Sequence, residues 1–155
     1  YIAECHPNHI IIRLSSCYTD FDHYRGHWVP NLIKALMSGA EIKLTNKGKQ
    51  VRDLLHVNDL GRLIELILKS NKKGIKINSG GGKDNVLSIL QFLELIDSNS
   101  KISNLRGDDY GFVFSNKVVK KEFNWVPEIL FRERLPIIKK NLAKGISALN
   151  KIIEN

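Results

Sequence analysis

Two arginines, Arg52 and Arg106, are the residues of this sequence whose types and settings best fit the binding of an anion. Arg52 lies within residues 51–57, a stretch too apolar to face solvent along its whole length. A guanidinium in such a segment needs a partner, because an unpaired buried charge is strongly unfavourable. Asp53 or Asp59 could be a structural partner. An oxyanion such as a diphosphate could be a functional one, since it matches the planar fork of arginine.

Arg106 precedes the turn-like sequence Gly107-Asp108-Asp109, which is also consistent with an exposed surface position. If both arginines bind a ligand, they would clamp one diphosphate from two separate loops. The sequence places no nucleophile beside a base and no pair of carboxylates on one helix face. None of its tyrosines is followed four residues later by a lysine. We therefore expect binding residues, and no catalytic residues, in this chain.

A run of glycines, Ser79 to Lys83, invites comparison with phosphate-binding loops, since it lies between an expected strand and an expected helix. A Walker loop would need glycine in place of Ile77 and serine or threonine in place of Asp84. A dinucleotide fingerprint needs spaced glycines. The run predicts instead a turn whose backbone passes close to a ligand or to another strand.

Two further kinds of site are disfavoured. The residues that could bind zinc are Cys5, His6, His9, Cys17, His23 and His27. They would fall at opposite ends of one strand, so we expect ordinary surface histidines and no metal. Residues 117–155 hold nine Lys and Arg against four Glu. A nucleic-acid surface is one interpretation, but the terminal helix interleaves no aromatic residues with these charges, which favours a solvated helix face and no nucleic-acid partner.

Short apolar strands alternate with amphipathic helices along the chain, which indicates an α/β or α+β fold with a partly parallel sheet. His9–Leu14 is β-branched and continuously apolar, as in a strand buried on both faces. The polar loop 15–28 follows it, at the strand end where α/β proteins keep ligands. Further strands are expected at 41–45, 51–57, 75–77 and 110–114, and helices at 29–37, 60–68, 88–96, 117–123 and 132–155.

Helix starts have capping residues at two places. Asn58 or Asp59 could cap the helix over 60–68, and Ser88 could cap the next one. Both are predictions from residue type and position, because short oxygen-bearing side chains bind the first free N–H groups of a helix.

Length and composition set the class of the protein. The chain has 155 residues and a formal net charge of +8, with 43% hydrophobic and 26% charged residues, as in an ordinary globular domain or part of a larger one. No apolar run approaches the ~18 residues of a membrane span, so we expect no membrane association. Two cysteines without a signal peptide indicate a reducing compartment, and we expect a cytoplasmic protein.

Four passages resemble one family, the extended short-chain dehydrogenase/reductases that comprise the NAD-dependent epimerases and dehydratases of nucleotide sugars. Residues 12–18 resemble the family's strand ending in Arg-x-x-x-x-Tyr-Gly. Residues 48–60 resemble its Gly-x-x-x-Arg-Asp-x-x-x-Val-x-Asp block, the most specific stretch. Residues 25–29 and 78–88 resemble the Gln-Gly-Trp-Val and Asn-x-Gly-Gly-Gly passages of its CDP-tyvelose (CDP-paratose) 2-epimerase branch.

The resemblance implies a fold and a domain assignment. It covers nearly the whole chain and corresponds to the family's C-terminal half. Residues 1–155 would form an incomplete parallel sheet of a Rossmann-like α/β fold together with a small substrate-binding α/β domain. The N-terminal NAD-binding half, with its glycine fingerprint and Tyr/Lys pair, would precede Tyr1 and be absent from this chain.

The resemblance also implies roles for individual residues. Arg52 and Arg106 would hold the diphosphate of a nucleotide sugar, with Asp108 near the sugar or nucleotide. Trp28 would shape the sugar pocket, and His56 belongs with the substrate-binding residues. The residues expected beside the nicotinamide of NAD are Ser16, Cys17 and Tyr18.

The implied activity is a hydride transfer from C2 of the sugar to NAD and its return to the other face. The tyrosine base, its pKa lowered by a lysine, would belong to the other half, so the chain is expected to be inactive alone. A 4,6-dehydratase or 4-epimerase is the first alternative. The second is a non-catalytic remnant, or the partner of a separately encoded N-terminal half. A homo-oligomer is compatible with all three.

Overall fold

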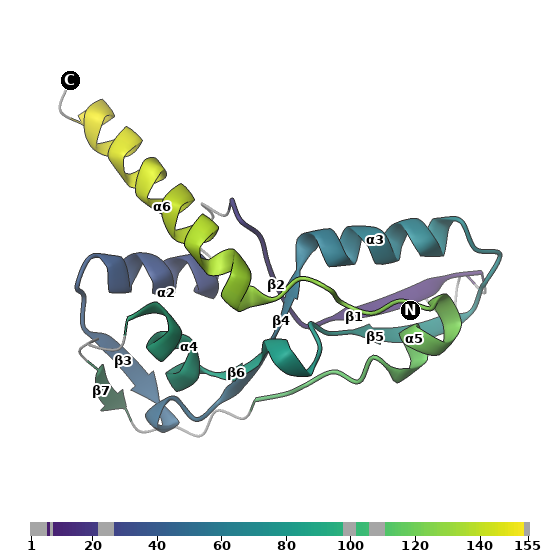
Figure 1. Ribbon diagram of the computed structural model, residues 1–155. Coiled ribbons are helices and arrows are strands. Elements are labelled where there is room, and N and C mark those ends of the chain that lie inside the picture. The colour runs from purple at the N-terminus through teal and green to yellow at the C-terminus, as the bar shows by residue number, and fades with distance from the viewer. Residues whose placement is uncertain (1–5, 7, 22–26, 98–101, 106–110, 154–155) are drawn as a thin grey trace.

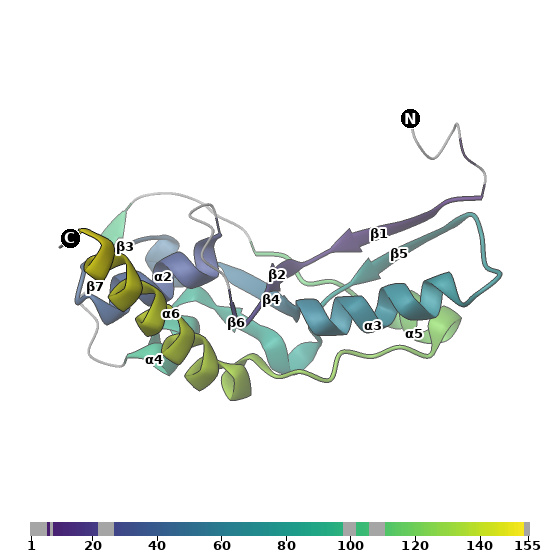
Figure 2. The same ribbon diagram turned by 90° about the horizontal axis from the view of Figure 1, so that it is seen from above.

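The structure, a computed structural model, describes residues 6, 8–21, 27–97, 102–105 and 111–153. Its elements form an elongated molecule with strand β4 (Val51–His56) near the middle (Figure 1). One group of elements packs at the end of β4 and another packs around its start. The view from above separates these two groups along the long axis (Figure 2).

The first group is a parallel strand pair with helices packed on it. Strand β1 (Ile10–Leu14) pairs with β5 (Ile75–Ser79) from Ile10 opposite Ile75 to Leu14 opposite Ser79. Helices α3 (Val57–Leu68) and α5 (Lys117–Phe123) lie beside this pair. Together they bury what we call the small cluster, which consists of Leu55, Leu63, Ile77, Val119, Phe123 and Trp125.

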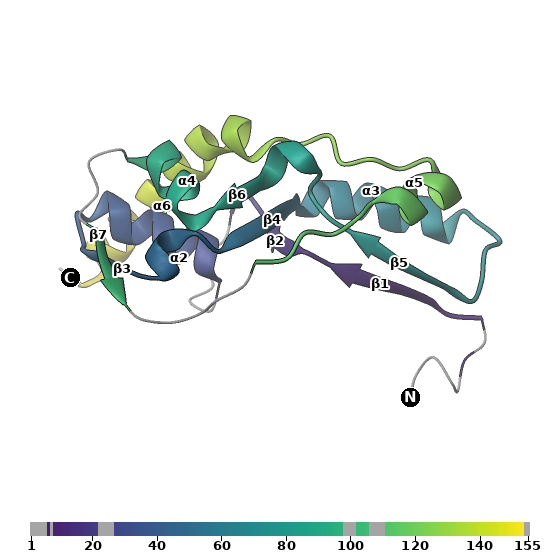
Figure 3. The same cartoon turned by 90° about the horizontal axis from the view of Figure 1, so that it is seen from below.

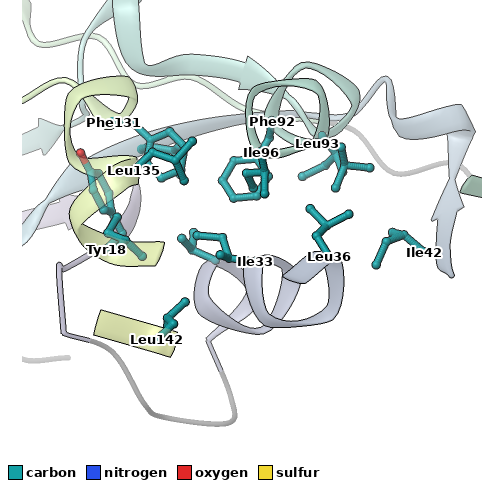
Figure 4. Close-up of a cluster of buried hydrophobic side chains, with 14 of the residues drawn as sticks. Tyr18, Ile33, Leu36, Ile42, Phe92, Leu93, Ile96, Phe131, Leu135 and Leu142 are labelled. Carbon is teal, nitrogen blue, oxygen red and sulfur yellow. The ribbon is translucent and has the colours of Figure 1, made fainter. Parts of the chain in front are cut away.

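The second group is built from three helices and another parallel pair. Its helices are α2 (Trp28–Met37), α4 (Ile89–Ile96) and α6 (Phe131–Ile153), and its strands are β3 (Ile42–Thr45) and β7 (Ile102–Leu105). They enclose the large cluster, whose members include Tyr18, Ile33, Leu36, Leu54, Phe92, Leu93, Phe131, Leu135 and Leu142. Figure 4 shows labelled side chains of this cluster, such as Ile33 of α2, Phe92 of α4 and Leu135 of α6, pointing toward one another. Burial of this apolar surface is the main force that holds the helices together.

Strand β4 connects the two clusters. Strand β2 (Ser16–Tyr18) pairs with its end in parallel, and β6 (Val86–Ser88) pairs with its start in antiparallel orientation (Figure 3). Because side chains alternate along a strand, neighbouring residues face opposite sides. Leu54 accordingly joins the large cluster and Leu55 the small one.

Most predicted elements are confirmed, including the strand at 10–14 and the α/β fold class. The predicted burial of that strand on both faces is wrong: Ile10 to Ile12 are half-buried, and Arg13 and Leu14 are exposed, because among the described residues β1 pairs with β5 alone.

Ser88 caps α4 as expected: its hydroxyl accepts from Gln91 N, while the Gln91 side chain accepts from Ser88 N. The predicted cap of α3, Asn58 or Asp59, is wrong. His56 occupies the N-cap, and its Nδ1 accepts a hydrogen bond from Asn58 N at 3.1 Å.

A strand was predicted at 110–114. The structure describes residues 111–114 of this segment, and they form no strand, so the prediction is wrong there. Three short strands were not predicted: β2, β6 and β7. The loop 15–28 therefore begins with strand structure. In the described part of the chain, no helix combines the length and apolarity that crossing a membrane requires.

Candidate functional site

Arg52 lines a cavity of about 500 Å³ at the start of β4. The other residues of its wall are Trp28, Asn31, Leu32, Ala35, Gln50 and Ile89. They come from the first turns of α2, from the residue before β4 and from the first residue of α4. The wall is mostly apolar, with a guanidinium and two amides as its polar groups. Such a composition is typical of small-molecule sites.

The Arg52 side chain is half-buried, and its Nη1 donates to the Val51 carbonyl at 3.0 Å. The two carboxylates that the sequence offered as structural partners bind other groups. Asp53 accepts from Gly81 N at 2.6 Å and from Phe114 N at 3.0 Å. Asp59 pairs with Arg62 at 2.6 Å. Both carboxylates therefore have hydrogen-bond partners of their own in the fold.

A second cavity, of about 280 Å³, adjoins Trp28. Its wall consists of Ser16, Cys17, His27, Trp28 and Val29. Trp28 thus contributes to both cavities, and its ring packs against Phe92 at 5.0 Å between centroids. Partial desolvation raises the pKa of the Cys17 thiol, which favours the protonated form over a nucleophilic thiolate.

Tyr18 and His56, both predicted as site residues, are buried together instead of lining either cavity. Their rings meet edge to face with centroids 5.0 Å apart, and Tyr18 makes the same contact with Phe131 at 5.2 Å. Burial raises the pKa of Tyr18, and the charge of Asp20 adds to the shift. Both side chains face the large cluster because alternation on β2 and β4 turns them inward. Their roles toward a ligand stay predictions.

The sequence did not predict the ion pair that fixes the loop after β2. Arg134 of α6 donates to Asp20 through Nε at 3.0 Å and also through Nη2. Asn141 donates to the Asp20 carbonyl at 3.0 Å. The hydrogen bonds from Arg134 lower the pKa of Asp20. The residues after the Ser16–Cys17 cavity are thereby attached to α6.

The glycine run forms the close-approach turn that the sequence predicted. A Cβ on Gly81 would lie 1.6 Å from the Leu54 carbonyl oxygen, and one on Gly80 would lie 2.2 Å from Asp53 Oδ2. Gly80 N also donates to Asn116 Oδ1 at 2.8 Å. The glycines thus let the turn after β5 touch β4, and Asp53 holds it there.

Of the predicted substrate-binding residues, Arg52 and Trp28 share the larger cavity. Of the predicted NAD-binding residues, Ser16 and Cys17 share the smaller cavity with Trp28. Arg106 and Asp108 lie outside the described residues. The sequence did not single out Gln50. Its position two residues before Arg52 was a usable signal, because residues i and i+2 of a strand share a face. Within the described ranges, no three His, Cys, Asp or Glu side chains gather as metal ligands.

Comparison with known proteins agrees with this architecture. The model of the NAD dependent epimerase/dehydratase family matches residues 1–80. The dTDP-glucose 4,6-dehydratase of Shigella flexneri is 25% identical over 135 residues, which cover 79% of this chain and 37% of that protein. The crystal structure of dTDP-glucose 4,6-dehydratase from Bacillus anthracis, in complex with NAD, superposes with a TM-score of 0.75 and 26% identity, covering 87% of this chain and 44% of that one.

UDP-glucuronic acid 4-epimerase from Bacillus cereus, in complex with UDP-glucuronic acid and NAD, has the same fold at 19% identity, with a TM-score of 0.75 over 87% of this chain and 45% of that one. The chain therefore spans less than half the length of these relatives, and its α/β Rossmann-like fold corresponds to part of theirs. Because the family model covers more than half of the sequence, this chain belongs to the NAD dependent epimerase/dehydratase family.

Proposed function

We propose that this chain is the substrate-binding part of an NAD-dependent enzyme that epimerises or dehydrates a nucleoside-diphosphate sugar. The observation that carries the proposal is the position of Arg52, half-buried in the wall of a largely apolar cavity. A guanidinium there offers two parallel N–H groups to a phosphate, and the low-polarity surroundings strengthen the attraction. The family, shared with proteins that act on nucleotide sugars, supports the same ligand class.

The rest of the larger cavity suits the organic part of such a ligand. Trp28, Leu32, Ala35 and Ile89 give it an apolar wall, which favours burial of a flat base or the carbon face of a sugar. Arg106 and Asp108 complete the proposed site, with Arg106 on the same diphosphate and Asp108 near the sugar or nucleotide. Tyr18 and His56 would support the pocket from within the large cluster.

The smaller cavity is the proposed place for the nicotinamide end of NAD. NAD, when bound, supplies reversible hydride transfer. Ser16 and Cys17 line this cavity. The hydroxyls of Ser15, which precedes Ser16, and of Ser79, whose carbonyl accepts from Ser15 N at 3.0 Å, are buried without a hydrogen-bond partner among the described residues. Ser15 and Ser79 stand at the carboxyl ends of β1 and β5, where α/β sheets bind ligands. Such polar groups fit a cofactor edge, and Trp28 would separate it from the substrate.

The proposal treats residues 1–155 as the C-terminal part of the enzyme, in which the last Rossmann strands are interleaved with the substrate-binding domain. The glycine fingerprint and the Tyr/Lys pair would be supplied by an N-terminal half, within a longer chain or as a separate polypeptide. Without them the chain would bind substrate and turn over none. The passages around Trp28 and Gly80 to Gly82 favour a CDP-tyvelose-type 2-epimerase. The names of the relatives favour a 4,6-dehydratase or a 4-epimerase.

A titration tests the ligand class. UDP-glucose, dTDP-glucose and CDP-glucose are each titrated into the chain by calorimetry, and we expect at least one to bind. Arg52→Met should then lower the affinity for that ligand by about 10- to 150-fold, because a charge-assisted contact contributes about 1.5–3 kcal/mol. Arg132→Met, which removes an exposed arginine of α6, is the control and should change nothing. Equal affinity of the two variants would refute the diphosphate assignment.

A reconstitution assay tests the reaction. The chain is mixed with an N-terminal half that carries the glycine fingerprint and the Tyr/Lys pair, together with NAD and the nucleotide sugar that binds. Product configuration is read by proton NMR. Inversion at C2 supports the 2-epimerase, whereas inversion at C4 or loss of water identifies the alternatives. Binding without turnover would indicate a non-catalytic remnant.

A further inference from the structure

Helix α3 carries a row of apolar side chains that lies exposed along its surface. Val57 and Ile64 are each 41% exposed, and Leu68 is 79% exposed. Gly61, which is also exposed, lies between them. These four residues follow one another at intervals of four, three and four positions, so they share one face of the helix. We call this face the α3 stripe.

The α3 stripe is not the face that packs against the rest of the chain. Leu63 belongs to the small cluster, and Leu60 and Ile67 pack against it. Arg62 lies on another side of the helix, where it pairs with Glu128 at 2.8 Å. Because a helix has 3.6 residues per turn, the α3 stripe is turned roughly 100° or more away from both contacts. Helix α3 itself forms the upper rim of its end of the molecule (Figure 1).

Gly61 is an unexpected residue for the middle of an exposed helix. Glycine weakens a helix there, because it loses the most conformational freedom on folding. The structure gives Gly81 a reason to be glycine, since a Cβ would lie 1.6 Å from the Leu54 carbonyl oxygen, whereas a Cβ on Gly61 would have open space within 4 Å. A glycine on a helix surface instead provides a shallow point that a side chain of another helix can fill.

We infer that the α3 stripe is a dimer interface, on which α3 packs antiparallel to α3 of a second copy of this chain. Intervals of four and three residues are those of the core positions of a coiled coil. About a two-fold axis, Val57 then faces Leu68 of the partner subunit, and Gly61 faces Ile64 of the partner subunit. Both pairs are centred on the same point of the helix, as an interface between identical surfaces requires. This inference goes beyond the proposed function and does not depend on it.

Shape and polarity favour the antiparallel arrangement over a parallel one. In a parallel pair, Gly61 would face the same glycine of the partner subunit and leave a gap, whereas the antiparallel pair fills that point with isoleucine. Asn58 and Glu65 are exposed and directly follow Val57 and Ile64. The antiparallel arrangement places Asn58 beside Glu65 of the partner subunit, so an amide donor meets a carboxylate instead of a like charge. Opposite ends of the two helix dipoles also lie side by side.

The size of the contact predicts a reversible dimer. Helix α3 has 12 residues, so it is about 18 Å long and about 10 Å wide. Such a contact covers far less than the ~800 Å² that each partner of a stable complex buries. We therefore expect monomers at low concentration and dimers at high concentration, with a dissociation constant between about 10 µM and 1 mM.

Sedimentation equilibrium over that range of concentrations tests the interface. The unmodified chain should shift from monomer toward dimer. Ile64→Glu and Leu68→Glu should each raise the dissociation constant at least about 10-fold, because a carboxylate would be buried in an apolar contact. Leu66→Glu is the matched control, since Leu66 is 40% exposed on the same helix but lies outside the α3 stripe. It should dimerise like the unmodified chain, and circular dichroism checks that all variants keep their helices.

Disulfide trapping tests the direction of the pairing. A chain with both Val57→Cys and Leu68→Cys should form covalent dimers on mild oxidation. Val57→Cys alone should form no more than the unmodified chain, because the two introduced thiols would lie roughly 16 Å apart along the helix axis. Efficient cross-linking of the single variant would indicate parallel helices and overturn the inference.

Two other results would also overturn it. One is a chain that stays monomeric throughout the range, and the other is an equal loss of dimer in Leu66→Glu and Ile64→Glu. If the monomeric chain associates through the α3 stripe only when the N-terminal half of the reconstitution assay is added, the stripe belongs to that half. The titration of nucleotide sugars is unaffected by any of these outcomes, so the proposed function stands or fails separately.

Discussion

The two faces of one short segment, residues 50–53, use buried polar groups in opposite ways. On one face, Asp53 is 1% exposed and accepts from two main-chain N–H groups, those of Gly81 and Phe114. On the other face, Gln50 and Arg52 border a cavity, and Gln50 leaves a buried oxygen without a partner in the described chain. The two faces thus differ in whether a buried polar group has its hydrogen bonds completed within the described chain.

Burial alone does not distinguish Asp53 from Gln50, because both residues are buried. What distinguishes them is whether each polar atom of the side chain has a hydrogen-bond partner in the described chain. A buried group with complete hydrogen bonds stabilises the fold, whereas a buried acceptor without a partner lowers stability. Substitutions on the two faces should therefore have very different effects on the free energy of unfolding.

The largest effect is expected from Asp53→Asn. The amide would keep one acceptor oxygen and turn an NH₂ group toward a main-chain N–H, so one charge-assisted bond is lost and a donor faces a donor. We expect a loss of about 3 kcal/mol in the free energy of unfolding, measured by urea denaturation. The exposed Asp84→Asn is the matched control and should stay within about 0.5 kcal/mol of the unmodified chain. Equal stability of the two variants would contradict the structural role of Asp53.

A smaller effect is expected at the pair of Asp20 and Arg134, which is saturated but more accessible. The pKa of Asp20 is lowered in the folded chain, chiefly by hydrogen bonds from Arg134. The pair therefore contributes stability above the ordinary aspartate pKa of about 4, and the contribution disappears as the pH falls through the lowered folded value. Arg134→Met should cost about 1 kcal/mol at pH 7 and progressively less below pH ~4.

Urea denaturation at several pH values measures this difference. Arg132→Met, on the same turn of α6 but exposed, should follow the unmodified chain at every pH. A stability difference for Arg134→Met that is constant from pH 7 to pH 3 would argue against the ion pair with Asp20.

The smallest effect on stability is expected from Gln50→Met. The substitution removes a buried oxygen that lacks a partner among the described residues and replaces it with an apolar group of similar volume. The gain from deleting the unsatisfied acceptor and the loss of the long bond to Thr45 nearly offset each other. The free energy of unfolding should change by less than about 0.5 kcal/mol, measured as for Asp53→Asn. A loss comparable to that of Asp53→Asn would erase the distinction between the two faces.

The local pattern of apolar and capping residues was sufficient to predict the longer helices and strands. The apolar run of β1, the spacing of α2 and the cap at Ser88 each depend on residues near one another in sequence. Strands β2, β6 and β7 have only three or four residues each and exist through pairing with distant segments. The strand predicted at 110–114 was wrong because the Phe114 N–H binds the Asp53 carboxylate, 61 residues away.

The site was predictable to a similar extent. An arginine in an apolar run indicated Arg52, and the family resemblance indicated Trp28. The cap of α3 was misassigned because the Asp59 carboxylate is taken by Arg62 and by the main chain of Glu128 and Ile129. The ion pair of Asp20 with Arg134 joins residues 114 apart, and no local pattern encodes such a contact.

The junction at Leu54 and Leu55 has a consequence for how the molecule denatures. These two consecutive residues, each fully buried, anchor the hydrophobic interiors of opposite ends. Neither end can unfold without exposing to water a leucine that belongs to the cluster of the other end. The two halves should therefore come apart in one transition, and the amide hydrogens of β4 should be among the slowest in the chain to exchange with deuterium.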